Sequence, residues 1–238
     1  NSKPVFSALA GVYGLEHIPA TMIDRVEVMR GGGSALFGSS AIGGTINIIT
    51  KDPVTNTAEV SHTLTTIGMS GALDNNTTAN ASIVNDNGKT GLFVYGQSRE
   101  RDHYDHNDDG FSEIGTIDAK TLGVNTFYNI TDNSKIRAEY SATNEYRRGG
   151  DQLDIPPHQA MIAEQTDHKI HAGNITYDLW SKDYKNKYNV YAALRDTKRD
   201  SYYGSNMDPN AYGSTHDLVV VGGGQFVHKF FKLWFMPA

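Results

Sequence analysis

The segment 102–113 holds the densest group of side chains that could bind a metal ion, Asp-His-Tyr-Asp-His-Asn-Asp-Asp-Gly-Phe-Ser-Glu. Asp105, Asn107 and Asp109 occupy alternate positions, and Gly110 follows them. This pattern matches the first half of a calcium loop, in which oxygens at alternate positions converge on one hard cation and a glycine permits the sharp turn. These three residues are our candidate calcium ligands.

The second half of the calcium pattern is absent. Thr116 stands where an EF-hand requires a bidentate glutamate, so the segment is not an EF-hand. Asp102 or Glu113 could supply a further carboxylate to the same cation. The residues alone leave two interpretations open, a calcium site and a solvated acidic turn.

A glycine-rich segment at 30–44 could bind phosphate, because Gly33 and Gly38 have the outer spacing of a Walker A loop. However, Ser39 and Ser40 stand where that motif needs Lys followed by Ser or Thr. The glycines are better explained by tight turns and close backbone packing.

Catalysis has no support in the sequence. There is no cysteine, and Gly33-Ser34 lacks the flanking pattern of a nucleophile elbow, so we expect no enzyme. His168 and His171 would lie on opposite faces of a strand and would not share a metal ion. His103 and His106 could bind a transition metal or haem from a loop, although isolated loop histidines are usually only polar.

Thirteen tyrosines suit two roles, belts at membrane interfaces and contact surfaces outside a membrane. Tyr202, Tyr203 and Tyr212 lie among loop residues and are our candidates for ligand contacts. A loop packing on itself would explain the same residues.

Polar and apolar residues alternate from about residue 58 onward, which predicts β-strands with one apolar face. We expect eight strands and the start of a ninth, at 58–67, 77–84, 90–101, 120–130, 135–147, 168–181, 186–200, 216–228 and 232–238. Short turns near 85–88, 131–134 and 181–185 alternate with long loops at 102–119, 148–167 and 201–215. This alternation is typical of an up-and-down outer-membrane barrel.

Composition narrows the function classes. The net charge is −6 and the pI is near 5.8, so we expect no nucleic-acid partner. No apolar run approaches the ~20 residues of a spanning helix, whereas a barrel strand needs only ~9–11. The chain has no signal-peptide pattern at its start and stops within an apolar run, so we expect a fragment whose remaining strands lie beyond Ala238.

Residues 18–50 resemble the end of the plug domain of TonB-dependent outer-membrane receptors. The resemblance is carried by Ile18-Pro19, the segment 23–30, Ser-Ala-Leu-Phe-Gly at 34–38 and Gly-Gly-Thr-Ile-Asn-Ile-Ile-Thr at 43–50. Gly32 departs from the family, which usually has proline there, and this affects only the stiffness of the turn.

The resemblance implies an all-β membrane barrel of 22 strands that encloses a small α+β plug, of which this chain holds a part. Residues 1–52 would be the C-terminal part of the plug, and residues 53–238 the first eight to nine barrel strands. The signal peptide and the TonB-contacting segment would be missing. Arg30 sits where the family pairs plug arginines with barrel glutamates. Glu139 is a local candidate partner, and capping of plug carbonyls is the alternative role of Arg30.

The family resemblance also implies a function. We expect a receptor in the outer membrane of a Gram-negative bacterium, surrounded by lipid, that imports a large scarce nutrient with energy delivered by TonB. Cobalamin, haem and ferric siderophores are open, as is a surface lipoprotein partner. Vitamin B12 receptors of this family carry a similar Asp/Asn-rich calcium loop, so the resemblance predicts calcium at Asp105, Asn107 and Asp109 and favours cobalamin. The alternatives are a soluble secreted glycan-binding module with structural calcium and an unplugged porin.

Overall fold

The computed structural model describes residues 19–31, 41, 43–68 and 71–230 of the 238-residue chain. Within these residues it contains two antiparallel sheets, one of two strands and one of eight. The predicted ninth strand at 232–238 and most of the glycine-rich segment lie outside the described residues.

The smaller sheet is a hairpin near the N-terminus. The 3₁₀ turn η2 (Ala20–Met22) leads into β1 (Ile23–Met29), which pairs with β2 (Thr45–Thr50). Gly44 adopts φ 129° immediately before β2, and a Cβ there would lie 2.7 Å from the carbonyl oxygen of Met29. A glycine is therefore required at this position.

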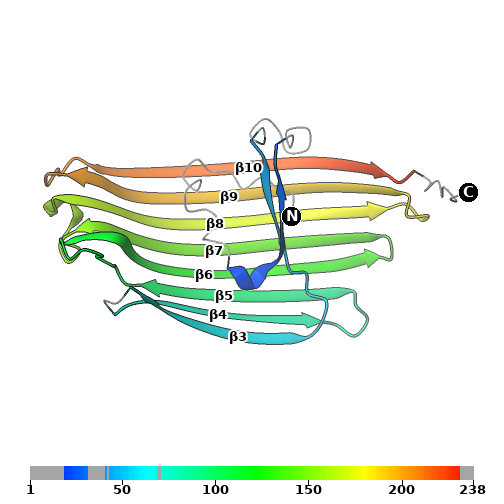
Figure 1. Cartoon of the computed structure of the whole chain (residues 1–238). Helices are drawn as coiled ribbons and strands as arrows, with labels where there is room; N and C mark the ends of the chain where they lie inside the picture. The colour runs from blue at the N-terminus through cyan, green and yellow to red at the C-terminus, as the bar shows by residue number, and fades with distance from the viewer. Residues whose placement is uncertain (1–18, 32–40, 42, 69–70, 231–238) are drawn as a thin grey trace, which may run out of the picture.

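The larger sheet is an uninterrupted antiparallel meander, β3 to β10, in which each strand pairs with the next along the chain. Figure 1 shows these strands side by side, with the β1–β2 hairpin crossing in front of them. Their bounds are β3 (Thr57–Ile67), β4 (Ala72–Val84), β5 (Thr90–Arg101), β6 (Phe111–Thr131), β7 (Ser134–Asp151), β8 (Ile162–Trp180), β9 (Asn186–Ser205) and β10 (Tyr212–His228). The predicted up-and-down arrangement is confirmed.

The two faces of the large sheet differ in chemistry. The face that contacts η2 is the inner face, and the central half of the opposite face is apolar and exposed. Its residues include Leu92, Val94, Leu122, Ile175, Tyr177, Tyr188, Val190, Leu194, Leu218 and Val220. An exposed apolar band of this kind is what a sheet presents to lipid.

The connections are shorter than predicted. The loops are 102–110, 152–161 and 206–211, because β6, β7, β8, β9 and β10 all continue into segments expected to be loops. In these extensions outward side chains such as Asp118 and Asp167 are polar, so the alternation of apolar and polar residues ends while the strand pairing does not. The short turns lie where they were predicted, at the opposite ends of the strands (Figure 1).

On the inner face of the large sheet, a small hydrophobic core joins the hairpin to the strands. Met22, only 8% exposed, packs against Phe93 and Tyr95 on β5, with Ile23 beside them.

None of the described helices is long and apolar enough to cross a membrane.

Candidate functional site

The predicted metal-binding residues lie at the tip of the loop between β5 and β6. Tyr104 and Ile114 form an isolated antiparallel bridge that closes this loop, with backbone hydrogen bonds of 2.8 and 3.1 Å. Carboxylate oxygens of Asp105, Asp109 and Glu113 all lie within 4.8 Å of one another. Three hard oxygen ligands therefore converge on one point, as a calcium ion requires.

Asp105 organises the loop around this point. Its carboxylate accepts backbone N–H groups from Asp108 and Gly110 at 2.7 Å each and from Asn107 at 3.2 Å. Partial burial raises the pKa of Asp105, but the backbone hydrogen bonds, led by that of Gly110, outweigh burial and lower the pKa below its ordinary value. A carboxylate has about four lone-pair sites, so capacity for a cation remains.

The other predicted ligands lie in different settings. The side-chain N–H of Asn107 donates to Asp109 at 3.0 Å, so the amide group of Asn107 contacts the cluster. Glu113 accepts the backbone N–H of His106 at 2.7 Å. Asp102 accepts the backbone N–H of Leu73 at 3.0 Å and thereby ties the loop to β4.

The residues present fit a calcium ion. Asp105, Asp109 and Glu113 would hold it, with the amide oxygen of Asn107 as a further ligand, and all four donors are oxygens. His106 lies in the same loop, but its ring nitrogen Nδ1 is 2.9 Å from the hydroxyl of Tyr104.

The three candidate tyrosines lie where the loops 152–161 and 206–211 meet. Tyr202 is fully buried against Ala160, Ala163 and Ala211, and its hydroxyl donates to the carbonyl of Asp208 at 2.9 Å. Tyr202 therefore supports the loops from within.

Tyr212 is the cross-strand partner of Tyr202 and lies on the same face of the sheet, whereas Tyr203 follows Tyr202 on β9 and points to the opposite face. Tyr203 and Tyr212 are about half exposed, at 49% and 51%. The hydroxyl of Tyr212 is 2.7 Å from His158, and its ring meets that of Tyr202 edge-on at 4.9 Å. The loop 152–161 and the start of β10 thus share a small aromatic surface at His158 and Tyr212, and Tyr203 is not part of it.

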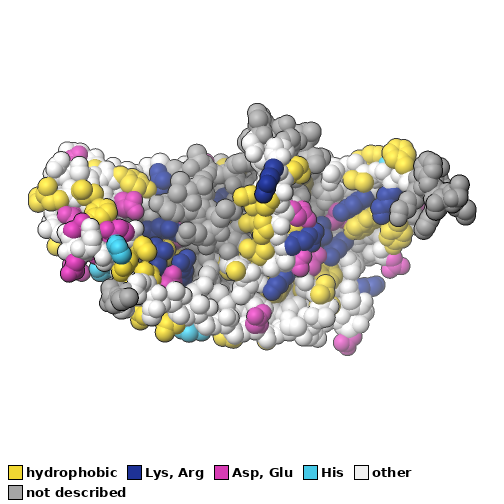
Figure 2. All heavy atoms as spheres, in the orientation of Figure 1, with side chains coloured by type: hydrophobic (Ala, Val, Ile, Leu, Met, Phe, Trp, Pro, Cys, Tyr) yellow, Lys and Arg dark blue, Asp and Glu magenta, His cyan; other side chains and the backbone are white. Residues whose placement is uncertain are grey.

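The inner face of the large sheet carries paired charges. Arg99 forms two hydrogen bonds to Asp74, at 3.0 and 2.7 Å, and Arg147 pairs with Glu145 at 2.9 Å. Figure 2 shows Lys and Arg side chains on the face that carries the hairpin. Because these arginines are held by carboxylates, they line the inner face as fixed polar groups.

A second charge cluster lies on the inner face near the short turns. Asp178 is completely buried, and it accepts hydrogen bonds from Arg137, from Lys187 at 3.0 Å and from Asn189 at 2.9 Å. Asp52, which follows β2, lies 3.6 Å from Lys135 and 4.0 Å from Arg137. The segment that leaves the hairpin is thereby attached to the sheet by charge.

Arg30 is exposed, at the end of β1. Its expected local partner Glu139 lies on the inner face, where it accepts the side-chain N–H of Asn174 at 2.8 Å. The pairing of Arg30 with a barrel glutamate stays a prediction. His168 is buried on the inner face, whereas His171 points outward to the hydroxyl of Tyr140 at 2.8 Å, so the two histidines lie on opposite faces as expected.

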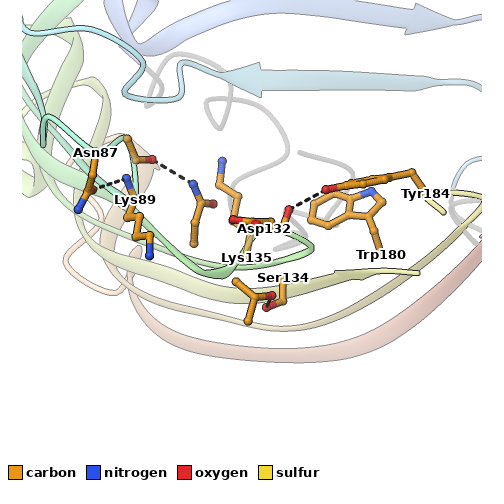
Figure 3. A pocket seen from close by; sticks show the side chains of 10 residues that line it. Asn87, Lys89, Asp132, Ser134, Lys135, Trp180 and Tyr184 are labelled. Carbon is orange, nitrogen blue, oxygen red and sulfur yellow. Dashed lines mark hydrogen bonds between the residues drawn. The ribbon is translucent and has the colours of Figure 1, made fainter. Parts of the chain in front are cut away.

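A hollow of about 420 Å³ opens among the short turns (Figure 3). It is lined in part by Lys135, Trp180 and Tyr184, and the hydroxyl of Tyr184 donates to the carbonyl of Asp132 at 3.0 Å. Lys135 also lies 4.2 Å from the ring centre of Phe127. The hollow is at the opposite end of the strands from the acidic loop, so the two do not form one site.

Comparison with known families and proteins agrees with this architecture. Residues 1–45 match the TonB-dependent receptor plug domain. The chain is 32% identical over 131 residues to the vitamin B12 transporter BtuB of Photobacterium profundum, a match that covers 49% of this chain and 20% of that protein. It is 52% identical over 44 residues to the BtuB of Vibrio vulnificus, covering 18% of this chain and 7% of that protein.

The fold is also found in a solved structure. The siderophore receptor PirA from Acinetobacter baumannii superposes with a TM-score of 0.68 and 18% sequence identity, covering 87% of this chain and 32% of that one. The resemblance to TonB-dependent receptors is therefore confirmed: a plug-domain sequence precedes strands with the barrel fold of such a receptor. The chain spans about a fifth of the first relative and a third of the solved structure. No comparison supports the soluble glycan-binding module.

Proposed function

We propose that the protein is a TonB-dependent receptor of the outer membrane that imports a large, scarce nutrient. The observation that carries this proposal is the plug-domain match at residues 1–45 joined to an antiparallel meander with an exposed apolar outer face. The matched proteins are named as transporters and a receptor, which supports transport over catalysis. TonB would deliver the energy that moves the plug.

Cobalamin is our first candidate substrate. The match to the vitamin B12 transporter of Photobacterium profundum covers about half of this chain, which is more than residues 1–45 can account for, so the likeness extends into the strands. The fold alone is shared with a siderophore receptor and does not favour one nutrient over another. Haem and ferric siderophores are therefore the competing substrates in the test.

The loops would capture the nutrient outside the cell. The half-exposed ring of Tyr212 would offer a ligand an apolar surface with a hydroxyl group, and Tyr203 would contact a ligand only from the opposite face of the sheet. Calcium bound by Asp105, Asp109 and Glu113 would neutralise three converging carboxylates and fix the loop between β5 and β6. A rigid loop binds its ligand with a smaller loss of conformational entropy.

The test is equilibrium binding of cyanocobalamin, haem and a panel of ferric siderophores to the detergent-purified full chain, with and without a calcium chelator. We expect cyanocobalamin to bind and the chelator to weaken that binding. Binding of haem or a ferric chelate, without any effect of the chelator, would still support a nutrient receptor. It would contradict cobalamin as the substrate and a role for calcium in the loop. Binding of none of them, together with recovery of the protein in a detergent-free soluble fraction, would reject the proposed function.

The calcium ligands have a matched control in the same loop. Asp109→Asn removes one charge from the carboxylate cluster, and we expect it to abolish calcium uptake measured by calorimetry. Asp108 has φ 63° and its carboxylate is not part of the cluster, so Asp108→Asn removes the same charge from a backbone conformation that asparagine also adopts. Equal calcium uptake by wild type and Asp109→Asn would rule out this site.

A further inference from the structure

The strand register arranges most outward-facing charges of the large sheet into two rows. One row crosses all eight strands and contains, in order, His62, Thr77, Ser98, Lys120, Asn144, Lys169, Lys198 and His216. It holds three lysines, two histidines and no acid. We name Lys120, Lys169, Lys198 and His216 the outer cation row.

The acidic side chains form the next row toward the long loops. That row contains Leu64, Asn75, Glu100, Asp118, Tyr146, Asp167, Asp200 and Ser214. On the other side of the outer cation row lies the apolar band, beginning with Leu122 on β6 and Leu218 on β10. The cations thus separate the apolar band from these acids, except at Asp196, which lies beside Leu218 in the first row of the band and 2.8 Å from His216.

The height of the apolar band places the outer cation row at a membrane boundary. On β6 the outward residues from Leu122 to Ile130 are mostly apolar, and eight steps of ~3.4 Å span about 27 Å along the strand. A strand tilt of about 40° reduces this to about 21 Å along the membrane normal, close to the ~25 Å apolar band of outer-membrane barrels. Lys120, two residues beyond Leu122, would lie at the level of the lipid headgroups.

Two lysines in the row oppose each other without a counter-charge. Lys169 and Lys198 are direct cross-strand partners, and both side chains are exposed on the same face. Like charges directly opposite in a sheet are destabilising. Among the described residues neither lysine forms an ion pair, whereas Lys120 is 3.3 Å from Asp118 and His216 is 2.8 Å from Asp196. An anion between the two lysines would relieve their repulsion.

We propose that the outer cation row binds the phosphate groups of lipids in the outer leaflet, with Lys169 and Lys198 as the principal contacts. This inference rests on the membrane location in the proposed function but not on the nutrient. Lysines at a lipid surface attract anionic headgroups, and their adjacent positions on two strands suit a lipid with more than one phosphate.

The test uses the full chain in neutral detergent, titrated with a lipid A that carries two phosphates and followed by native mass spectrometry. We expect Lys169→Gln/Lys198→Gln to weaken binding on the order of 25-fold, because each lysine contributes about fivefold at an anionic surface. Lys182→Gln/Lys229→Gln removes two exposed lysines near the short turns and should leave binding unchanged. The same lipid without phosphates should bind the wild type as weakly as the phosphorylated lipid binds Lys169→Gln/Lys198→Gln.

Equal binding of the phosphorylated lipid by wild type and Lys169→Gln/Lys198→Gln would overturn the proposal that the outer cation row binds lipid phosphates. Equal binding of the two lipids by wild type would also overturn it. So would displacement of the phosphorylated lipid by inorganic phosphate at the concentration of the lipid. These results would leave nutrient binding untouched. Conversely, a chain that binds the phosphorylated lipid through these lysines but binds no nutrient would retain the outer cation row and reject the receptor function.

Discussion

The carboxylate of Asp105 accepts the backbone N–H of Gly110 at 2.7 Å, across the tip of the loop between β5 and β6. Gly110 has φ 86°, a conformation that glycine adopts without steric cost, so the chain can turn back toward Asp105. The loop is thereby folded around its carboxylate cluster by its own hydrogen bonds. A cation would complete an arrangement that already exists.

The pH dependence of the loop follows from the lowered pKa of Asp105. Because the folded pKa lies below the unfolded value, Asp105 stabilises the folded loop at pH above the unfolded value. This contribution is lost as the pH falls through the lowered folded pKa. Titration of the Asp105 carboxyl ¹³C shift should give a midpoint below ~3.9, the ordinary value for aspartate. A midpoint at or above that value would contradict the role of the backbone hydrogen bonds.

Contact between the hairpin and the sheet should depend on Met22. Met22→Ala removes a buried side chain that packs against Phe93 and Tyr95, and we expect the free energy of unfolding to fall by roughly 2 kcal/mol or more. Val26→Ala on β1 is the control, because Val26 is 51% exposed. Hydrogen exchange of the β1 and β2 amides should be faster only in Met22→Ala. Equal exchange in both variants would show that this core does not hold the hairpin.

The buried carboxylate of Asp178 should be essential to the sheet near the short turns. Asp178→Ala would leave Arg137 and Lys187 close together without their shared acceptor. Because these two cations are 30% and 37% exposed, we expect the free energy of unfolding to fall by about 1.5 to 3 kcal/mol, the range for hydrogen bonds to charged groups. The exposed Asp132, in the nearby turn, provides the control variant Asp132→Ala. Thermal unfolding in detergent, followed by circular dichroism, should separate the two variants clearly. A midpoint for Asp178→Ala equal to that of Asp132→Ala would refute this assignment.

Two strand glycines should respond differently to alanine. A Cβ on Gly123 would lie 2.1 Å from the ring of Tyr95, whereas the nearest atom to a Cβ on Gly222 is 3.7 Å away. Gly123→Ala should therefore displace Tyr95 and lower the free energy of unfolding by about 1 to 3 kcal/mol. Gly222→Ala should be nearly neutral. Chemical denaturation of both variants measures the difference, and equal midpoints would argue against the close packing of Tyr95 on β6.

Strand positions could be predicted from the sequence where one face is apolar and the other polar. This holds for the central part of β7, where Ile136, Ala138 and Tyr140 alternate with Arg137 and Glu139. The prediction ended too early toward the long loops, because residues there are polar on both faces. Backbone pairing needs no such alternation, and β9 continues as far as Ser205.

Side-chain partners depend on strand register, which the alternation does not specify. The sequence placed Glu139 on the polar face but gave no reason to pair it with Asn174, and the burial of Asp178 had no local signal. Tyr202 illustrates the same limit. Its position in a polar loop predicted a ligand contact, whereas the crossing of two loops places it in a core.

The most direct test of the receptor function is uptake of labelled cyanocobalamin by cells that carry or lack the gene for this protein, measured with TonB intact and with TonB disrupted. We predict that uptake at low cyanocobalamin concentration requires both the gene and TonB. Uptake that is unchanged by loss of the gene would contradict cobalamin import. Uptake that requires the gene but not TonB would contradict the proposed mechanism of transport.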